Sequence, residues 1–477
     1  MRYAHALDGD GFVAALTFAG DGNVQYTGRF VETEYFRAEQ EQDQILYRNV
    51  FGTQPAAWWK NIANVNLKNV ANTNILQWGG RLLVLWEGGR PYELDPVTLE
   101  TLDHPCVKDD STGESKESEW GPFENLGQPE VAFRGVTIDE GGDIDTKLNF
   151  GRSFTAHPHV VLDKDSKTQT LVGIKAALNP MEVSVKMEIV EYDQDWTEKL
   201  RTPYTLAQAP SAPHDFSISK SYYCLVQNRL GLDNLPFLLG LKSPSQVLEL
   251  SVREPSILHL IPKNKELPAM QFELPPYFNL HNVPTAIETD DDKLILFSNG
   301  WDLADERYFP ADKEKTPFLG SWGGRYPDFR FVPPSHLFRT IVDLRKNVLI
   351  SHEEVIPGLV MEFPTQDDSD DDRVYFNVAC TDNTSLPGTG VGQLDVNNPE
   401  GIQYWYAEPK IFTGEVNIVP KRNGEKGSWL LTILYDFAEK RASLAILDSE
   451  RFSDGPVCRI HLKHALAYGL HGSFAQR

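Results

Sequence analysis

Short apolar segments recur along the whole chain, and turn-forming residues bound many of them. Gly, Asp, Asn or Pro stand at their ends, as is typical of β-strands joined by tight turns. The 3.6-residue periodicity of amphipathic helices is scarce by comparison. The strands that we predict from this pattern are Phe12–Phe18, Leu82–Trp86, Thr170–Ile174, Val183–Tyr192, Tyr222–Gln227, Leu294–Phe297, Val348–Ile350, Val374–Val378 and Trp429–Tyr435.

One hairpin theme occurs near both ends of the chain. A strand ends in a turn, and a second strand with apolar residues and a terminal Leu-Asp pair follows it. Arg81–Leu85 is followed in this way by Tyr92–Asp95, and Ser428–Leu431 is followed by Leu444–Asp448. Successive hairpins with sequence drift between them are typical of propeller blades, although a large β-sandwich could also produce them. The pattern therefore favours an all-β fold.

Length alone would suggest two domains for 477 residues. A propeller is the main exception, because it grows by adding blades around one axis. We find no long linker rich in Pro, Gly or Ser that would mark a boundary. The chain is 41% hydrophobic and 11% aromatic, which is enough for a large core, and its 35 Gly and 31 Pro residues favour many turns.

Charge and cysteine usage exclude some partners and indicate a compartment. The formal net charge of −23 argues against nucleic acid and against an anionic membrane held by basic residues. A membrane contact made by apolar residues remains open. The four cysteines form no CxxC motif, which is typical of reduced thiols inside the cell. We expect an intracellular protein, in the cytoplasm or a plastid.

Two segments depart from the strand pattern. Residues at about 107–150 are polar, acidic and Gly-rich, which predicts a surface insertion. Residues 230–241 are apolar but too few to span a bilayer, and Pro236 and Gly240 should break any strand or helix there. This run could pack as a buried loop. It could also form an exposed patch that dips into a membrane or frames an apolar tunnel.

Four histidines in separate local settings are the main chemical candidates: His157, His214, His281 and His471. One imidazole from each of four distant segments can converge on a single metal. Imidazole suits iron, copper, nickel and zinc, so the histidines alone do not select the metal. The alternative is that they are surface or packing residues, as most of the 12 histidines must be.

Three further histidines could compete with these four for a metal. His159 lies two residues after His157, and His461 and His464 lie close to His471. Proximity in sequence alone does not decide between them.

Neutral imidazoles leave the charge of a divalent metal uncompensated. Histidine ligands usually donate their second N–H to a nearby carboxylate or carbonyl, so we expect buried glutamates around the site. Glu87, Glu362 and Glu415 are candidates, because each lies among apolar, Gly or Pro residues where burial of an unpaired carboxylate would be costly. Exposed turn glutamates are the alternative. The chain has no GxSxG, P-loop or dinucleotide motif that would indicate other chemistry.

At these residues the chain resembles the carotenoid cleavage oxygenases, and most closely the cyanobacterial apocarotenoid oxygenase type. The similarity covers nearly the whole sequence. The segments that carry it are Leu46–Gly52, Lys68–Asn74, Leu85–Gly89, the His157 and His214 segments, Glu362–Pro364, Leu462–His464 and Leu470–Ser473.

The resemblance implies one domain, a seven-bladed β-propeller with a cap of loops and short helices over one face. It implies Fe2+ on the propeller axis, with His157, His214, His281 and His471 as its ligands. It implies that Glu87, Glu362 and Glu415 accept hydrogen bonds from His214, His281 and His471, in that order. Thr73 matches a threonine whose methyl group crowds an open iron position.

The activity that the resemblance implies is cleavage of a C=C bond by O2. The substrate would be an apolar polyene, a carotenoid or apocarotenoid, and the products would be two carbonyl compounds. A stilbene-cleaving or isomerising member of the same fold is an alternative, as is a non-catalytic propeller that binds a lipid or partner. A zinc hydrolase is disfavoured, because catalytic zinc rarely has four histidines and no carboxylate. Residues 230–241 fall where family members have an apolar rim that contacts membranes.

Three features depart from the family pattern. The opening segment, with its Leu-Tyr-Arg-Asn-Gly-Pro pattern, is missing ahead of residue 1, so part of the N-terminal segment is expected to be absent. Around His281 the family pattern Phe-His-x-x-Asn-Ala-x-Glu is replaced by Leu280–Glu288, which is one residue longer. Val416 follows Glu415 where proline is usual. Of the four ligands, His281 is the one with the most altered surroundings.

Overall fold

The computed structural model describes residues 3–64, 66–102, 137–138, 144–145, 152–163, 166, 168–179, 182–320, 323, 332–367, 370–379, 387–422 and 425–475. They form two compact units, which we describe one at a time. The first comprises Met1–Ala212, Leu232–Leu248 and Gly323–Tyr326, and the second comprises Pro213–Gly231, Glu249–Trp322 and Pro327–Arg477. Most of the predicted insertion at 107–150 lies outside the described residues.

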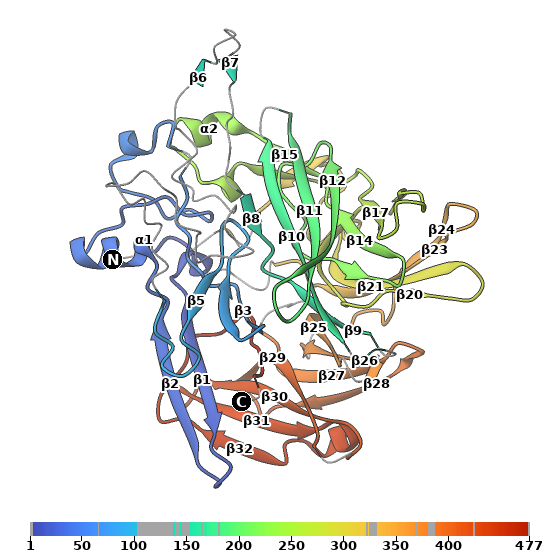
Figure 1. Cartoon of the computed structure of the whole chain (residues 1–477). Helices are drawn as coiled ribbons and strands as arrows, with labels where there is room; N and C mark the ends of the chain where they lie inside the picture. The colour runs from blue at the N-terminus through green and yellow to red at the C-terminus, as the bar shows by residue number, and fades with distance from the viewer. Residues whose placement is uncertain are drawn as a thin grey trace. The chain divides into compact units, whose positions relative to one another are not determined.

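The first unit is built from antiparallel sheets that begin with a long hairpin (Figure 1). The hairpin joins β1 (Phe12–Phe18) and β2 (Val24–Phe30). A three-stranded sheet follows, with β3 (Asn74–Trp78), β4 (Arg81–Leu85) and β5 (Tyr92–Leu94). The largest sheet has the order β12-β11-β10-β8, with β9 also on β10: β8 (Arg152–Phe154), β9 (His159–Leu162), β10 (Gln169–Asn179), β11 (Ser184–Tyr192) and β12 (Glu198–Leu206). A small pair joins β6 (Thr137–Ile138) and β7 (Ile144–Asp145).

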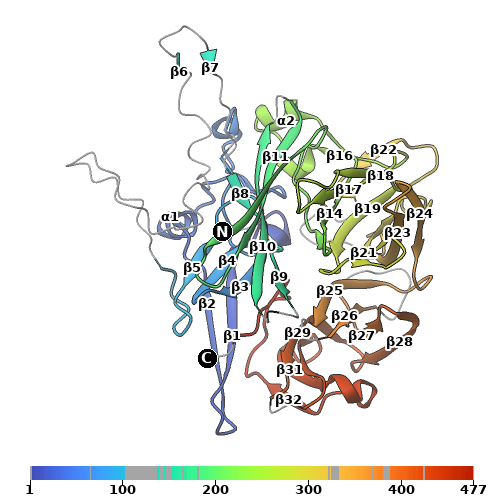
Figure 2. The ribbon, with the colours of Figure 1, turned by 45° about the vertical axis from the view of Figure 1, so that its right-hand side comes forward.

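The second unit contains four antiparallel sheets that follow one another along the chain (Figure 2). The first has β13 (Ser217–Ile218), β14 (Tyr222–Gln227), β17 (Ile257–Pro262) and β18 (Met270–Glu273). The second has β19 (Tyr277–Asn282), β20 (Ile287–Glu288), β21 (Lys293–Asp302), β23 (His336–Asp343) and β24 (Val348–Glu354). The third has β25 (Met361–Asp367), β26 (Asp370–Val378), β27 (Gly390–Asp395) and β28 (Asn398–Tyr406). The fourth has β29 (Ile411–Pro420), β30 (Ser428–Asp436), β31 (Arg441–Asp448) and β32 (Cys458–His461).

A smaller sheet completes the strands that the structure describes. It has the order β15-β16-β22, with β15 (Leu230–Leu232), β16 (Leu248–Ser251) and β22 (Lys315–Pro317). The described fold is thus all-β with few helices, as the sequence predicts. Each of the nine predicted strands coincides with or lies largely within an observed strand, and the bounds of β1 and β14 agree at both ends.

The recurrent Leu-Asp ending of the hairpin theme has a structural reason. Both predicted hairpins form, as β4 with β5 and as β30 with β31. In each, the terminal aspartate accepts hydrogen bonds from the turn that follows. Asp95 binds the N–H groups of Val97 and Thr98, and Asp448 binds that of Glu450. These aspartates therefore stabilise the turns that follow their strands.

The helices are short, and the sequence pattern did not predict them. Helix α1 (Glu34–Gln42) begins after Thr33, whose hydroxyl accepts the N–H of Phe36 as an N-cap. Helix α2 (Asn234–Leu238) shows that the predicted break at Pro236 is wrong. Pro236 lies in the first helical turn, where its missing N–H costs no hydrogen bond. Gly240, with a φ of 73°, does end the segment as expected. Short 3-10 helices among the described residues include Ala6–Asp8, Trp58–Asn61, Pro244–Gln246 and Ser449–Asp454.

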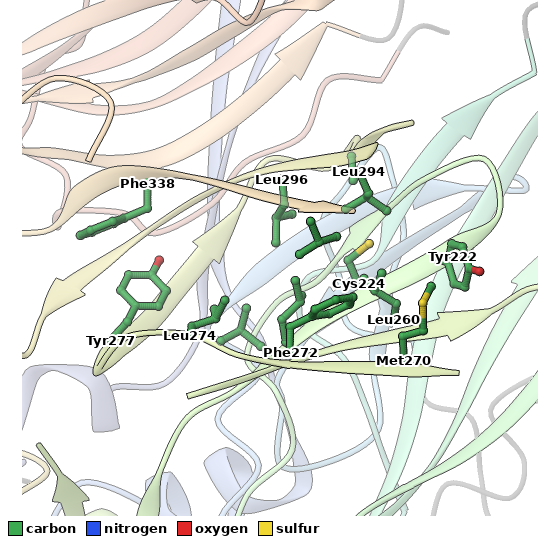
Figure 3. Close-up of a cluster of buried hydrophobic side chains, with 14 residues drawn as sticks. Tyr222, Cys224, Leu260, Met270, Phe272, Leu274, Tyr277, Leu294, Leu296 and Phe338 are labelled. Carbon is green, nitrogen blue, oxygen red and sulfur yellow. The ribbon is translucent and has the colours of Figure 1, made fainter. Parts of the chain in front are cut away.

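Buried side chains join neighbouring sheets of the second unit. Figure 3 shows the cluster between the first two of its sheets, where Cys224, Leu260 and Phe272 meet Leu294 and Leu296. Burial of one such side chain contributes about 1.5–3 kcal/mol. His281 lies in the second of these sheets, in β19, and His214 lies just before the first strand of the other sheet, β13. The packing between the two sheets therefore helps to fix the two histidines relative to each other.

Candidate metal centre

Three of the predicted ligands come together in the second unit from distant parts of the sequence. His214 lies just before β13, His281 lies in β19, and His471 lies in the segment after β32. The Nε2 atoms of His214 and His281 are 3.2 Å apart. The ring centroids of His281 and His471 are 5.6 Å apart. The altered sequence around His281 therefore does not remove this residue from the cluster.

A buried carboxylate orients the ring of His281. Its Nδ1 atom lies 3.3 Å from Oε2 of Glu362, at the start of β25. Burial by itself would raise the pKa of Glu362, but its hydrogen bonds with His281, Ser335 and Asn299 and the charge of His281 outweigh this effect. The pKa of Glu362 is therefore lowered from its usual value of 4.5. The carboxylate is thus held in its charged, hydrogen-bond-accepting form.

A second carboxylate, that of Glu415, holds the segment around His471 by two bonds. Oε1 of Glu415 lies 2.7 Å from Nδ1 of His471, and Oε2 accepts the backbone N–H of Gly472 at 2.7 Å. The hydroxyl of Tyr468 donates to the carbonyl of Thr413, two residues before Glu415. Ring and backbone of the segment around His471 are therefore fixed to β29. The predicted pairings of Glu362 with His281 and of Glu415 with His471 are both present.

Three residues of this centre lie at irregularities in their strands. The register of β19 shifts at Asn279–His281, that of β25 at Glu362–Thr365, and that of β29 at Thr413–Val416. Such bulges re-aim side chains that would otherwise alternate between the two faces of a sheet. At the second bulge, Phe363 adopts a positive φ of 55°, and its ring packs against those of His281 and His471.

The remaining predicted residues lie in the first unit. His157 follows β8 and is buried, with its backbone N–H bonded to the Thr155 hydroxyl. Its Nε2 atom lies 3.8 Å from Oε1 of Glu87, which follows β4 and is 41% exposed. Thr73 precedes β3, and its backbone N–H donates to the carbonyl of Leu85. The expected pairing of Glu87 with His214, and the sharing of one metal by four histidines, stay predictions.

Of the histidines that could compete, His159 and His461 lie on strands, and His464 lies just after β32. His159 is part of β9, opposite Val172 of β10. His461 ends β32 and is exposed, as is His464. Two other histidines contact side chains of neighbouring strands: Nε2 of His259 lies 2.9 Å from Oε1 of Gln227, and Nδ1 of His352 lies 2.8 Å from the Thr340 hydroxyl. Burial lowers the pKa of each to about 4.

The donor set of the second unit fits a metal that prefers imidazole. Metal–imidazole bonds of about 2.0–2.1 Å place adjacent ligand nitrogens roughly 3.0–3.4 Å apart, and the His214 and His281 Nε2 atoms meet this requirement. Nδ1 of His281 and of His471 is directed at a carboxylate, which favours the tautomer whose Nε2 can act as a metal ligand. The 3.2 Å separation therefore fits two ligands of one metal, and without a metal it also fits a hydrogen bond between the two rings.

Sequence reasoning missed two residues of the site. Ser335 donates its hydroxyl to Oε1 of Glu362 at 2.6 Å, and the side-chain amide of Asn299 donates to Oε2 at 3.0 Å. Neither lies in a motif that stands out in the sequence. Only the pairing of strands brings them to Glu362.

Comparison with known proteins shows the family to which the chain belongs. Residues 1–476 match the family model described as retinal pigment epithelial membrane protein, RPE65. The apocarotenoid-15,15'-oxygenase of Synechocystis is 28% identical over 99% of this chain and 86% of its own length. The chloroplastic carotenoid cleavage dioxygenase 7 of Oryza sativa is 26% identical over 98% of this chain and 82% of its own.

The similarity to a solved structure agrees with this family match. The crystal structure of cobalt-substituted Synechocystis ACO superposes with a TM-score of 0.79 at 27% identity, covering 99% of this chain and 88% of that one. Fold, histidine cluster and family match define one class, the metal-dependent oxygenases of this all-β fold. The chain belongs to the RPE65 and carotenoid cleavage oxygenase family.

Proposed function

We propose that this protein is a non-haem Fe2+ dioxygenase that uses O2 to cleave a C=C bond of a carotenoid or apocarotenoid. The observation that carries the proposal is the 3.2 Å approach of two imidazole Nε2 atoms, beside a third histidine, with two of the three rings bound to carboxylates. Each carbon of the broken bond takes one oxygen atom of O2. The two products are therefore carbonyl compounds, and the reaction needs no external reductant.

The proposed ligands are His157, His214, His281 and His471. Fe2+ with open coordination positions supplies the oxygen chemistry when it is bound. Glu362 and Glu415 accept the Nδ1–H groups of His281 and His471, which fixes the tautomer that presents Nε2. Glu87 is the proposed acceptor for His214, and the methyl group of Thr73 is proposed to crowd one open position. The proposed fold is a single domain, a seven-bladed propeller with a cap of loops and short helices.

An exposed apolar surface in the first unit is the proposed site of membrane contact. We call it the apolar patch. Its members and their exposed fractions are Trp58 52%, Trp59 63%, Ile62 45%, Leu235 63%, Leu238 45%, Leu239 44% and Leu241 57%. Its two segments touch, because the N–H of Ala63 donates to the carbonyl of Leu238 at 2.8 Å. Clustered exposure of this kind is unusual on a protein surface and favours the exposed-patch interpretation of residues 230–241.

The charge of −23 suggests a zwitterionic or neutral lipid surface as the partner. Among the residues that the structure describes, no helix combines the length and apolarity needed to cross a bilayer. An apolar polyene would be taken from such a surface. The location in cytoplasm or plastid stays a prediction.

The test is metal analysis of the purified chain, combined with O2 uptake on addition of a detergent-solubilised apocarotenal. Near-stoichiometric iron, O2 consumption and loss of the polyene absorption band are expected. A stilbene in the substrate panel tests the alternative substrate. Failure to bind iron after anaerobic Fe2+ addition would contradict the proposal and favour a non-catalytic binding protein.

A further inference from the structure

We propose that Asn299 is a positioning residue of the metal centre, which sets the Glu362 carboxylate and, through it, the ring of His281. The inference rests on the proposed function, because it assigns a role at the same metal site. Asn299 lies in β21, directly opposite His281 in β19, and its side chain is fully buried. A buried amide that contacts both a ligand segment and a carboxylate can couple their positions.

The contacts of Asn299 reach two different strands. Its Oδ1 atom accepts the backbone N–H of His281 at 3.0 Å. Its Nδ2 atom donates to Oε2 of Glu362 at 3.0 Å and to the carbonyl of Met361 at 3.1 Å. Oε2 of Glu362 is the same oxygen that faces Nδ1 of His281. Asn299, Glu362 and His281 therefore form a closed ring of hydrogen bonds that joins β19, β21 and β25.

The bonding partners of the Asn299 side chain determine which of its two terminal atoms is the oxygen and which is the nitrogen. A backbone N–H can only donate, so the atom that faces His281 N must be the oxygen. A backbone carbonyl and a carboxylate can only accept, so the atom that faces Met361 and Glu362 must be the nitrogen. All three bonds are satisfied by one orientation of Asn299. Neither a carboxylate nor a hydroxyl at this position could make them all.

The irregularity in β19 explains why the side chain of Asn299 contacts the backbone of His281. The register shift at Asn279–His281 moves the His281 N–H out of the regular ladder, and the side chain of Asn299 receives it. The next residue, Gly300, permits the close approach of the two strands, because a Cβ there would lie 2.0 Å from the carbonyl oxygen of Phe278. The bulge, the glycine and the asparagine thus act together on one ligand.

If the role of Asn299 were purely structural, another side-chain amide with similar bonds to β19 should affect the metal centre equally. Asn228 offers the comparison, because it also makes two amide bonds to β19. Its Oδ1 accepts the N–H of Asn279 at 2.8 Å and its Nδ2 donates to the Asn279 carbonyl at 2.9 Å. Both of these bonds are to the backbone of Asn279, and neither is to Glu362.

The experiment compares Asn299→Asp with the matched control Asn228→Asp in the full chain. Both variants exchange an amide donor for an oxygen with little change in volume. Metal-free protein is titrated with Co2+, and the visible ligand-field absorption reports both affinity and geometry. We expect Asn299→Asp to weaken Co2+ binding by about 10–100-fold and to change the absorption spectrum. Asn228→Asp, whose bonds reach only the Asn279 backbone, is expected to have a clearly smaller effect on both, and thermal unfolding of both variants is recorded alongside.

A double-mutant cycle with Glu362→Gln tests whether Asn299 acts on the metal centre through Glu362. If Asn299 acts through Glu362, its substitution adds little once Glu362 is already changed. Additive losses, or equal losses in the Asn299 and Asn228 variants, would overturn the inference while the metal centre stands. A wild-type chain that binds no Co2+ would overturn the proposed centre and the inference with it. If Asn299→Asp does not fold, Asn299→Ala is tested against Asn228→Ala by the same criteria.

Discussion

Nδ1 of His281 lies 3.3 Å from Oε2 of Glu362, although 81 residues separate them in sequence. The Glu362 carboxylate is also held by Ser335 and Asn299, so its position does not depend on the imidazole alone. We therefore expect the orientation of His281 to be set before any metal binds.

We predict that Glu362→Gln weakens iron retention by about 10–100-fold. The amide is the same size, but it carries no charge to offset the metal, and it can offer His281 only one acceptor oxygen. Affinity is measured by competition with a coloured chelator. Thr365→Ser, a small change in the same strand, serves as the control. Unchanged affinity would remove Glu362 from the metal site.

His214→Ala is expected to abolish both iron binding and activity, because it removes one of the two Nε2 atoms that lie 3.2 Å apart. Iron is measured by mass spectrometry and activity by O2 uptake. His464→Ala, at an exposed position outside the cluster, should leave both at wild-type levels. Full activity with normal iron in the His214 variant would refute the site.

Stability of the last sheet should depend on pH through Asp448. Burial alone would raise the pKa of this carboxyl, but bonds from Lys421 and the Glu450 N–H outweigh it, so the pKa lies below the usual 3.8. A depressed pKa in the folded state stabilises the fold at any pH above the unfolded value, and this contribution is lost as pH falls through the folded value. Asp448→Asn should cost about 3 kcal/mol at neutral pH, because it leaves the buried Lys421 ammonium without its charge partner.

Urea unfolding at several pH values checks this prediction. The difference between wild type and Asp448→Asn should be constant above about pH 5 and shrink as the pH falls below 3.8. A difference that does not change with pH would show that the Asp448 charge is not the cause.

The apolar patch should mediate binding to lipid. We predict that Trp59→Ser combined with Leu235→Ser reduces co-sedimentation with phosphatidylcholine vesicles several-fold, because burial of each side chain is worth about 1.5–3 kcal/mol. Val97→Ser is the matched control, since Val97 is 65% exposed but belongs to the turn after β5. Equal loss of binding in the control would contradict a specific patch.

Much of the sheet structure could be predicted from the sequence, because strands with turn residues at their ends are local patterns. The pairs Glu362 with His281 and Glu415 with His471 were also predicted, but from family resemblance rather than from periodicity. What the sequence does not reveal is how these residues face one another. Glu362 and Glu415 lie at bulges, whose only local signals are the neighbouring Pro364 and Gly414.

The helices and the supporting residues were missed for different reasons. Helix α1 has a clear N-cap in Thr33, but only nine residues and little amphipathic pattern. Asn299 and Ser335 are ordinary strand residues until pairing places them beside Glu362. Lys68 is fully buried and forms ion pairs with Asp10 and Glu39. These two partners likewise cannot be recognised from the sequence.

A single guanidinium supports the apolar patch through main-chain carbonyls and through the ring of Phe237, which is buried and not a member of the patch. Arg48 donates to the carbonyl oxygens of Asn61, Asn64, Phe237 and Lys242 at 2.5–3.3 Å. Carbonyl oxygens are the same in every residue, so this support does not depend on which side chains the patch displays. The exposed leucines and tryptophans can therefore be exchanged, by natural drift or by protein engineering, while the framework that displays them is retained.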